Sequence, residues 1–136
     1  MDEACPFCAI IDGAKEAPIV SETDGTLAFL DQNPAATGHT LVVPREHREN
    51  VVGTDSDVGD AIFETVDAVA SALDTVLEPD GFSVFHTTGS LVGSVSHAHV
   101  HVIPRTEDDG IGLSLNRSEL DSESGAELAD RLADSL

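Results

Sequence analysis

The chain has 136 residues, which is enough for one compact domain with a buried core and too few for two ordinary domains. Its 26 Asp and Glu residues outnumber 6 Lys and Arg, giving a formal net charge of −20, and the acids are spread along the sequence without forming a tail. This composition lacks the basic patch that contacts with nucleic acid phosphates require, and it favours a salt-rich cell interior, as in a halophile, where salt screens the self-repulsion.

The N-terminal residues lack the apolar run of a secretory signal, and no segment has the roughly 20 apolar residues that a transmembrane helix needs. We therefore expect a cytoplasmic protein without a membrane partner. The two cysteines, Cys5 and Cys8, form a single CxxC. In an intracellular chain this spacing favours a metal clip or a redox pair over a structural disulfide.

Three strands are predicted in the first half of the chain, after a short turn at residues 8–11. Residues 17–22 form an expected edge strand, and the turn signal Asp24-Gly25 joins it to a strand over residues 26–30, which predicts a hairpin. The β-branched residues in 39–44 predict the third strand, which ends in a proline.

Residues 58–77 change to the 3- and 4-residue spacing of an amphipathic helix, with Ser56 or Thr54 available as its cap and a Pro-Asp-Gly sequence after its end. The apolar positions that follow this spacing are Val58, Ile62, Val66, Val69, Leu73 and Val76. This long helix is the most clearly marked element of the sequence.

Two more strands are predicted over residues 81–87 and 95–103, joined by a glycine-containing loop. A helical extension at about 118–136 follows, in which Ser124-Gly125-Ala126-Glu127 has capping-box form and leucines recur every four residues. Together these elements predict one domain over residues 1–136 with an α+β fold. We expect a mainly antiparallel sheet, one long helix and a C-terminal helix, with the helices on one face of the sheet.

Three of the six histidines, His97, His99 and His101, occupy alternate positions. In a strand they would share one face, and the outer two Cα atoms would lie about 13 Å apart at about 3.3 Å per residue, so the row is too long to surround one metal ion by itself. The alternatives are buried structural imidazoles, a zinc site built on an HxH pair, and a histidine-rich metal-storage tract. The pattern favours acid–base or nucleophilic chemistry, with a central imidazole oriented by its two neighbours.

Several motifs occur in order along the chain: Phe29-Leu30-Asp31, then Gly38-His39-Thr40-Leu41-Val42-Val43-Pro44 with His47 three residues further on, and finally the histidine row with Pro104-Arg105. In this order and spacing the sequence resembles the histidine triad (HIT) superfamily of nucleotide-binding hydrolases and transferases, over about residues 5–105. The resemblance implies a HIT-like fold. It is nearest to the Hint-like branch, whose members cleave nucleoside phosphoramidates.

The resemblance also implies roles at the phosphate. The middle histidine of the family attacks the α-phosphate of a nucleotide and forms a covalent nucleotidyl-histidine, and this position is His99 here. A neutral imidazole is a competent nucleophile at neutral pH when an acceptor, often a backbone carbonyl, holds its other nitrogen. His101 matches the last triad histidine, which contacts phosphate and helps to protonate the leaving group, and His39 matches a fourth histidine that lines the phosphate site.

A nucleoside pocket is implied in the same way, for a purine nucleotide. Asp31 matches the acidic residue that accepts hydrogen bonds from ribose hydroxyls. The apolar positions that sandwich the base in the family correspond to Phe7, Ile10 and Phe29, which composition alone would assign to an ordinary core.

Some microbial members of the family bind a structural zinc ion through an N-terminal CxxC, the histidine after the VVP motif and the first triad histidine. The matching residues here are Cys5, Cys8, His47 and His97, a Cys₂His₂ set suited to tetrahedral zinc. The alternative is a pair of reduced thiols with His47 at the surface. On the zinc interpretation His97 is a metal ligand and takes no part in the chemistry.

The loop before the triad departs from the family pattern, because it contains neither the usual Asn nor the usual Gln. Counting back from His97 places His86 at the Asn position, whereas aligning on glycine places Thr87 there, in the nucleotide site. Ser94 falls at a position that contacts the phosphate or the leaving group in the first count, and at the Gln position in the second. Its hydroxyl suits either role, so the departure bears on substrate selectivity and rate.

The resulting hypothesis is an enzyme that hydrolyses or transfers nucleotides at the α-phosphate of purine nucleoside phosphoramidates or related nucleotides. The alternatives are a dinucleoside polyphosphate hydrolase, a zinc-stabilised nucleotide-binding module with little catalysis, and a metalloenzyme that uses the histidine row directly. Family members usually pair through the long helix and the adjacent strand, so we expect a homodimer.

Overall fold

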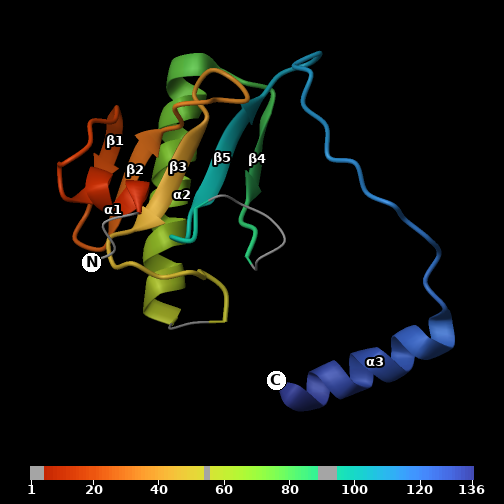
Figure 1. Ribbon diagram of the computed structural model, residues 1–136. Coiled ribbons are helices and arrows are strands. Elements are labelled where there is room, and N and C mark those ends of the chain that lie inside the picture. The colour runs from red at the N-terminus through yellow and green to blue at the C-terminus, as the bar shows by residue number, and fades with distance from the viewer. Residues whose placement is uncertain (1–4, 54–55, 89–94) are drawn as a thin grey trace.

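The computed structural model describes residues 5–53, 56–88 and 95–136. Within these ranges a five-stranded antiparallel sheet has the strand order β1-β2-β3-β5-β4, with β1 and β4 at its edges (Figure 1). The α+β fold and the mainly antiparallel sheet expected from the sequence are thereby confirmed. In chain order the elements are α1 (Pro6–Ile11), β1 (Ile19–Glu22), β2 (Thr26–Leu30), β3 (Thr40–Pro44), α2 (Ser56–Leu77), β4 (Gly81–Phe85), β5 (Val100–Arg105) and α3 (Ser122–Ser135).

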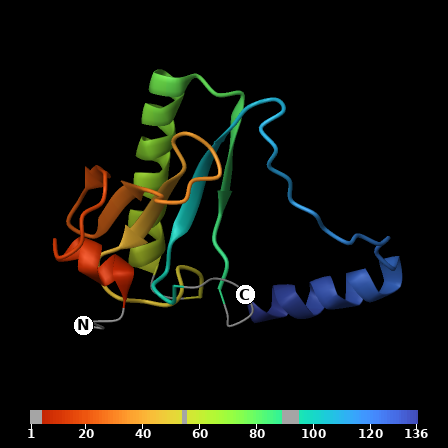
Figure 2. The same ribbon diagram turned by 45° about the horizontal axis from the view of Figure 1, so that its top comes forward.

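Alternation along the central strands divides the buried side chains between two cores, one on each face of the sheet. In β3, Val42 belongs to the core beneath α2, whereas Leu41 and Val43 belong to the opposite core with residues of α1. Helix α2 contributes Ile62 and Val69 to the first core, as its 3- and 4-residue spacing predicts. Figures 1 and 2 show α1 and α2 on opposite sides of the sheet. Helix α1 therefore adds a helix on the face opposite α2, in place of the turn that the sequence predicted.

Helix α1, which the sequence predicted only as a turn, positions both cysteines. Pro6 occupies its first turn, where a missing N–H leaves no helical hydrogen bond unmade. Cys5 caps the helix, because its Sγ accepts the Cys8 N–H at 3.3 Å. Phe7 and Ile10 are buried in the core on this side of the sheet. The CxxC thus lies at the start of a short helix that is held against the sheet.

The strands around the histidine row are shorter at their loop ends than the sequence predicted. β4 ends earlier than expected, at Phe85, and β5 begins later than expected, at Val100. The reason is the hydrogen bonding of the backbone before β5, where the Ala98 N–H donates to the Arg48 carbonyl in the loop after β3 (2.6 Å) and not to a neighbouring strand. The first two histidines of the row therefore precede the strand, and only the third lies in it.

The loop before β3 depends on a glycine. Gly38 has a φ of +92°, and a Cβ atom there would lie 2.7 Å from Leu77 Cδ1 and 3.0 Å from Leu73 Cδ2, at the C-terminal end of α2. Glycine alone accepts this backbone conformation together with so close an approach. The contact fixes the backbone that leads into His39.

Helix α2 begins at Ser56, just before the predicted range, and Thr54 lies outside the described residues. The helix ends at Leu77, as predicted. In the described ranges no helix combines the length and the apolar character needed to cross a membrane.

The C-terminal helix α3 stands apart from the sheet. Its N-cap is Asp121, whose carboxylate accepts the Ser124 N–H at 3.0 Å, so the expectation that Ser124 caps the helix is wrong. α3 has no buried residue, and Figures 1 and 2 show it at the end of an extended segment, away from α2 and the sheet. Leu128 and Leu132 are 51 % and 57 % exposed. The recurring leucines thus form an apolar face that does not cover the sheet, and the expectation that the C-terminal helix shares a face of the sheet with the long helix is wrong.

Candidate active site and metal centre

A cleft on the α1 face of the sheet brings together most of the residues predicted to bind the nucleotide, with two of the histidines. Its volume of about 360 Å³ is within the range of small-molecule sites. Its walls come from α1 and the segment after it, from β2 and β3, and from the region where β5 begins. The lining residues are Pro6, Phe7, Ile10, Lys15, Phe29, Asp31, Gln32, Asn33, Leu41, Val95, His99 and His101.

Aromatic rings and a carboxylate lie side by side in this lining. Phe7 and Phe29 meet edge to face with ring centroids 5.5 Å apart, and Phe7 lies 5.1 Å from the His99 ring centroid. Asp31 follows β2 directly, and its Oδ1 accepts the Asn33 N–H at 2.9 Å. The carboxylate is therefore held in place and keeps further acceptor capacity for a ligand.

The ring of His99 is oriented by the backbone. Its Nδ1 lies 2.8 Å from the His97 carbonyl oxygen, which only accepts, so Nδ1 carries the ring proton. Nε2 then has the lone pair, which is the form that a nucleophilic imidazole needs. A backbone carbonyl is the kind of acceptor that the sequence analysis expected at this position.

His39 and His101 form a hydrogen-bonded pair. The Ala35 N–H donates to His39 Nδ1 (3.0 Å), so the proton of the neutral His39 ring lies on Nε2. This Nε2–H donates to His101 Nδ1 at 2.9 Å. Asp31 Oδ2 lies 3.5 Å from His39 Nε2. The proton of His101 is consequently on its own Nε2, and the network gives His101 the tautomer that donates from that atom.

Burial keeps this pair neutral near pH 7. Desolvation, reinforced by the nearby His99 and His39 rings, lowers the pKa of His101 from 6.5 to about 4. Phe85 stacks on the His101 ring with centroids 4.5 Å apart. Burial also lowers the pKa of His39, against the opposing effect of the Asp31 carboxylate. The pair therefore suits directed hydrogen bonding to phosphate better than a cationic contact with phosphate.

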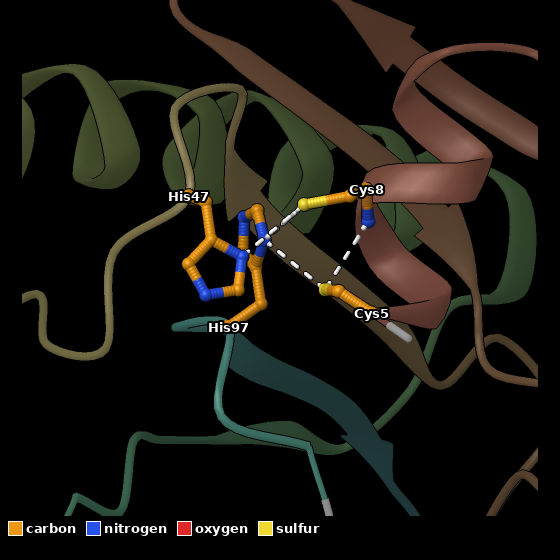
Figure 3. Close-up of side chains that lie close together, drawn as sticks. All are labelled: Cys5, Cys8, His47 and His97. Atoms are coloured by element: carbon orange, nitrogen blue, oxygen red, sulfur yellow. Dashed lines mark hydrogen bonds between the residues drawn. The ribbon is translucent and has the colours of Figure 1, made fainter. Parts of the chain in front are cut away.

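A second cluster lies on the other side of His97, beside α1 (Figure 3). The donor atoms of Cys5, Cys8, His47 and His97 are all within 4.8 Å of one another. Cys8 Sγ is 3.2 Å from His47 Nδ1 and 3.5 Å from His97 Nδ1. Cys5 Sγ is 3.6 Å from His97 Nδ1, and neither cysteine forms a disulfide. The four residues predicted as metal ligands are thus brought together.

The spacing and hydrogen bonding of this cluster fit a tetrahedral ion. Zn–S bonds of about 2.3 Å and Zn–N bonds of about 2.0–2.1 Å place neighbouring sulfur and nitrogen ligands roughly 3.5 Å apart. His97 Nε2 lies 2.7 Å from the Pro44 carbonyl and therefore carries the proton, which leaves Nδ1 as the ligand atom. Both the donor types and the backbone support of His97 suit zinc.

Comparison with known proteins places this geometry in a family. The sequence matches the family model of the HIT domain over residues 12–108. The chain belongs to the HIT family. The crystal structure of a HIT family protein from Bacillus anthracis is 34 % identical, with a TM-score of 0.90 over 100 % of this chain and 99 % of that chain. Its fold agrees with the HIT-like fold expected from the motifs.

Two further HIT relatives bear on the chemistry of the two clusters. The adenosine 5′-monophosphoramidase hnt1 of Schizosaccharomyces pombe is 32 % identical, over 81 % of this chain and 81 % of its own length. The crystal structure of a zinc-bound histidine triad family protein from Mycobacterium smegmatis is 32 % identical, with a TM-score of 0.73 over 96 % of this chain and 94 % of that chain.

Two of the predicted catalytic and nucleotide-binding residues of this HIT protein, His39 and Thr87, are absent from the described lining of the cleft. His39 is only 5 % exposed, and it contacts the site through its hydrogen bond to His101. Thr87 is exposed and follows β4 without reaching the cleft lining. Ser94 lies outside the described residues.

Two residues outside the predicted site list contribute to the site: Lys15, which had no expected role, and His86, which one of the two counts placed at the family Asn position. Lys15, the single lysine of the chain, lines the cleft. His86 bonds to the backbone of His99 through its Nδ1 (3.0 Å). The available signals were the rarity of lysine in so acidic a chain, and the count back from His97 that places His86 at the position of the family Asn.

The Asp31, His39 and His101 donors of the HIT site also lie within 4.8 Å of one another. A metal ion on His39 Nε2 would require an N–H at Nδ1, yet Nδ1 faces the Ala35 N–H, which is itself a donor. With a metal ion bound, the His39 Nδ1–H and the Ala35 N–H would point at each other, and neither would have an acceptor. The hydrogen bonding of these three residues therefore disfavours the metalloenzyme alternative.

Proposed function

We propose that this HIT protein hydrolyses purine nucleoside phosphoramidates or related nucleotides at the α-phosphate, through a covalent nucleotidyl-His99 intermediate. The observation that carries the proposal is the His99 ring, which lines the cleft with Nδ1–H bound to the His97 carbonyl and Nε2 as the available nucleophile. A relative named as an adenosine 5′-monophosphoramidase supports the choice of an amine leaving group.

The cleft offers complementary groups for the two halves of such a nucleotide. Phe7, Ile10 and Phe29 are buried in the core on this face of the sheet and also form part of the cleft lining, which suits a purine base. The Asp31 carboxylate suits the ribose hydroxyls, because it only accepts hydrogen bonds. Lys15 is the one lysine in a chain of charge −20 and would offset part of the repulsion that an anionic substrate meets.

The reaction would proceed in two displacements at phosphorus. In the first, His99 Nε2 attacks, a P–N bond to the ring forms, and the P–N bond to the leaving amine breaks as the amine nitrogen takes up a proton from solvent, while His101 Nε2–H donates a hydrogen bond to a phosphate oxygen. His39 holds His101 in the donating tautomer. In the second, water attacks phosphorus, its proton passes to solvent, and the bond to His99 breaks. The products are the free amine and a nucleoside monophosphate.

We further propose that Cys5, Cys8, His47 and His97 hold a structural zinc ion. The donor set and its spacing support this, as does the zinc-bound relative from Mycobacterium smegmatis. With all four positions filled by protein, the ion would cross-link α1, the loop after β3 and the segment before β5, and it would take no part in the displacements.

We also propose that the protein acts as a homodimer of single-domain copies in a salt-rich cytoplasm. Exposed apolar side chains on α2 and on the edge strand β4 suit contact with a second copy: Phe63 is 51 % exposed, Val76 is 76 % exposed and Val84 is 42 % exposed. Each copy has a formal charge of −20, so dissolved salt would favour the pairing by screening the repulsion between copies.

The substitution His99→Ala tests the covalent mechanism. Wild type and variant receive adenosine phosphoramidate at high salt, and the quenched protein is digested and mapped by mass spectrometry. We expect wild type to carry a nucleotidyl adduct on the peptide containing His99, and the variant to lose this adduct and roughly 10³-fold or more of the turnover. Monophosphate binding and zinc content should be retained.

The controls separate the alternatives. Turnover that survives in His99→Ala would refute the nucleophile assignment. A wild type that binds monophosphate but hydrolyses no nucleotide offered would favour a nucleotide-binding module with little catalysis.

A further inference from the structure

His86 occupies a bridging position between two segments that flank the cleft. It follows the last residue of β4, Phe85, and is half-buried. Its Nε2 accepts the Val51 N–H at 3.3 Å, in the loop that also carries His47. Its Nδ1 lies 3.0 Å from the His99 carbonyl oxygen. One imidazole thus joins the loop after β3 to the residue proposed as the nucleophile.

The two partners of His86 fix its protonation. A backbone N–H only donates and a carbonyl only accepts, so the ring is neutral with its proton on Nδ1. Both contacts use the backbone, and one of them would be lost in the other neutral tautomer. His86 therefore works as a connector with one donor and one acceptor at a fixed spacing.

The His99 carbonyl needs such a partner because the sheet ends beside it. The described ladder between β4 and β5 ends at the pair Phe85 and His101, and the ladder between β3 and β5 ends at Val42 and Val100. The backbone of His99 lies just beyond both ladders. A side chain supplies the hydrogen bond there in place of a neighbouring strand.

We propose that His86 is a positioning residue for the reaction of His99, an inference that rests on the proposed function. The His97 carbonyl holds the His99 ring, and His86 holds the His99 peptide group. The nucleophile is restrained at both ends, so Nε2 keeps its direction toward the α-phosphate. His86 is absent from the described cleft lining, so it acts through His99 and not on the substrate.

Three substitutions separate the two hydrogen bonds of His86. In His86→Asn the amide nitrogen stands near the place of Nδ1 and still donates to the His99 carbonyl. In His86→Gln the amide reaches the place of Nε2 and still accepts from Val51. His86→Phe keeps a ring and removes both bonds. His86→Asn and His86→Gln both introduce a side-chain amide. The Asn variant keeps the hydrogen bond to the His99 carbonyl, and the Gln variant keeps the one from the Val51 N–H.

The rate of adduct formation on His99 is the decisive measurement. We expect His86→Gln and His86→Phe to slow the single-turnover step and kcat roughly tenfold, the effect of one hydrogen bond, while KM changes by less than about twofold. His86→Asn should recover most of the wild-type rate. The ¹³C′ chemical shift of His99 should be near wild type in His86→Asn and displaced in the other two variants.

Each outcome decides one question. Equal rates for His86→Asn and His86→Gln, or a change confined to KM or to the melting temperature, would overturn the positioning role. An unchanged His99 ¹³C′ shift in all variants would overturn it even in the absence of turnover. A wild type that forms no adduct, with the shifts as expected, would instead reject the covalent mechanism. If His86→Phe fails to fold, the Asn and Gln variants still give the comparison.

Discussion

Backbone groups set the proton positions on four of the histidines. His39 faces a backbone N–H, His97 and His99 face carbonyl oxygens, and His86 faces one of each. A fixed tautomer decides whether a ring nitrogen attacks, donates or binds a metal ion. Two of these rings carry the proton on Nε2 and the other two carry it on Nδ1, so side chains of one type differ in the nitrogen that can accept.

The residues in the cleft could be predicted from the sequence more fully than their protonation. Phe29 and Asp31 belong to motifs whose spacing fixes their places in and after a strand, and both line the cleft. The tautomers depend on partners that are distant in the chain, such as Pro44, which is 53 residues from His97. No local pattern carries that information, and it has to come from the fold.

The lowered pKa of His101 predicts a pH-dependent contribution to stability. Its pKa is about 4 in the fold against 6.5 when unperturbed, so the unfolded chain binds more protons between these values. The contribution is fully present above about pH 6.5 and is lost as the pH falls toward about 4. Between about pH 7 and pH 5 we expect it to amount to about 1 kcal/mol, after allowance for screening of the half-buried ring.

Urea unfolding of wild type and His101→Gln at the two pH values measures this difference. Titration of the many carboxylates affects both proteins alike and cancels in the comparison. The wild type should lose more unfolding free energy on acidification than the variant. An equal loss would show that the His101 ring contributes nothing to the pH dependence.

At the scale of elements, the long amphipathic helix was predictable because its periodicity extends over many turns. Helix α1 was missed because six residues are too few to show a helical period, and its cap is a cysteine. The start of β5 was missed because apolar and polar residues keep alternating through Ala98, although its N–H already bonds to Arg48. An alternating pattern of apolar and polar residues shows which side chains are buried. It does not show where the backbone begins to pair with a neighbouring strand.

The junction between α2 and β3 gives a prediction about Gly38. We expect Gly38→Ala to lower the free energy of unfolding by roughly 2–4 kcal/mol, because a Cβ would clash with Leu77 and Leu73 at a positive φ. Gly59→Ala is the matched control, since Gly59 lies in α2 and a Cβ atom added there would meet nothing within 4 Å. It should raise stability by roughly 0.5–1 kcal/mol. Similar effects of the two substitutions would contradict this account of the junction.

At the scale of the whole molecule, the Cys₂His₂ cluster joins segments that are far apart in the chain. Cys5 and His97 are separated by 92 residues, and their donor atoms are 3.6 Å apart. Long loops closed in this way give the largest entropic stabilisation of the folded state. A zinc ion held by the cluster would therefore add a cross-link between the N-terminal helix and the segment that carries His99, in addition to the core contacts of Phe7 and Ile10.

Metal removal tests this role. We expect a chelator to lower the melting temperature of the wild type by on the order of 10 °C, because zinc binding contributes folding free energy. Cys5→Ser should bind less zinc and respond little to the chelator. Undiminished zinc in Cys5→Ser and His47→Ala, measured by elemental analysis, would rule out this site.

The proposed homodimer predicts different effects at the two edges of the sheet. Val84→Asp on β4 should weaken association at least roughly tenfold, whereas Ile19→Asp on β1 should leave it unchanged. The two side chains are matched in exposure, at 42 % and 44 %. Sedimentation velocity across a salt series gives the dissociation constants, which should fall as salt rises. A monomeric wild type at all salt concentrations, or dissociation by Ile19→Asp alone, would reject the expected interface.

His97 offers its ring to the metal cluster and its carbonyl to His99. The ring is specific to histidine, whereas a carbonyl is supplied by every residue type. A metal-free design at this position therefore needs a substitute that fills the space of the buried ring, satisfies the Pro44 carbonyl and keeps the orientation of the peptide. Conversely, a backbone shift in this segment would change the orientation of the His99 ring, even with all four residues of the Cys₂His₂ cluster still present. Redesign of either centre has to be judged by the geometry of this one peptide group.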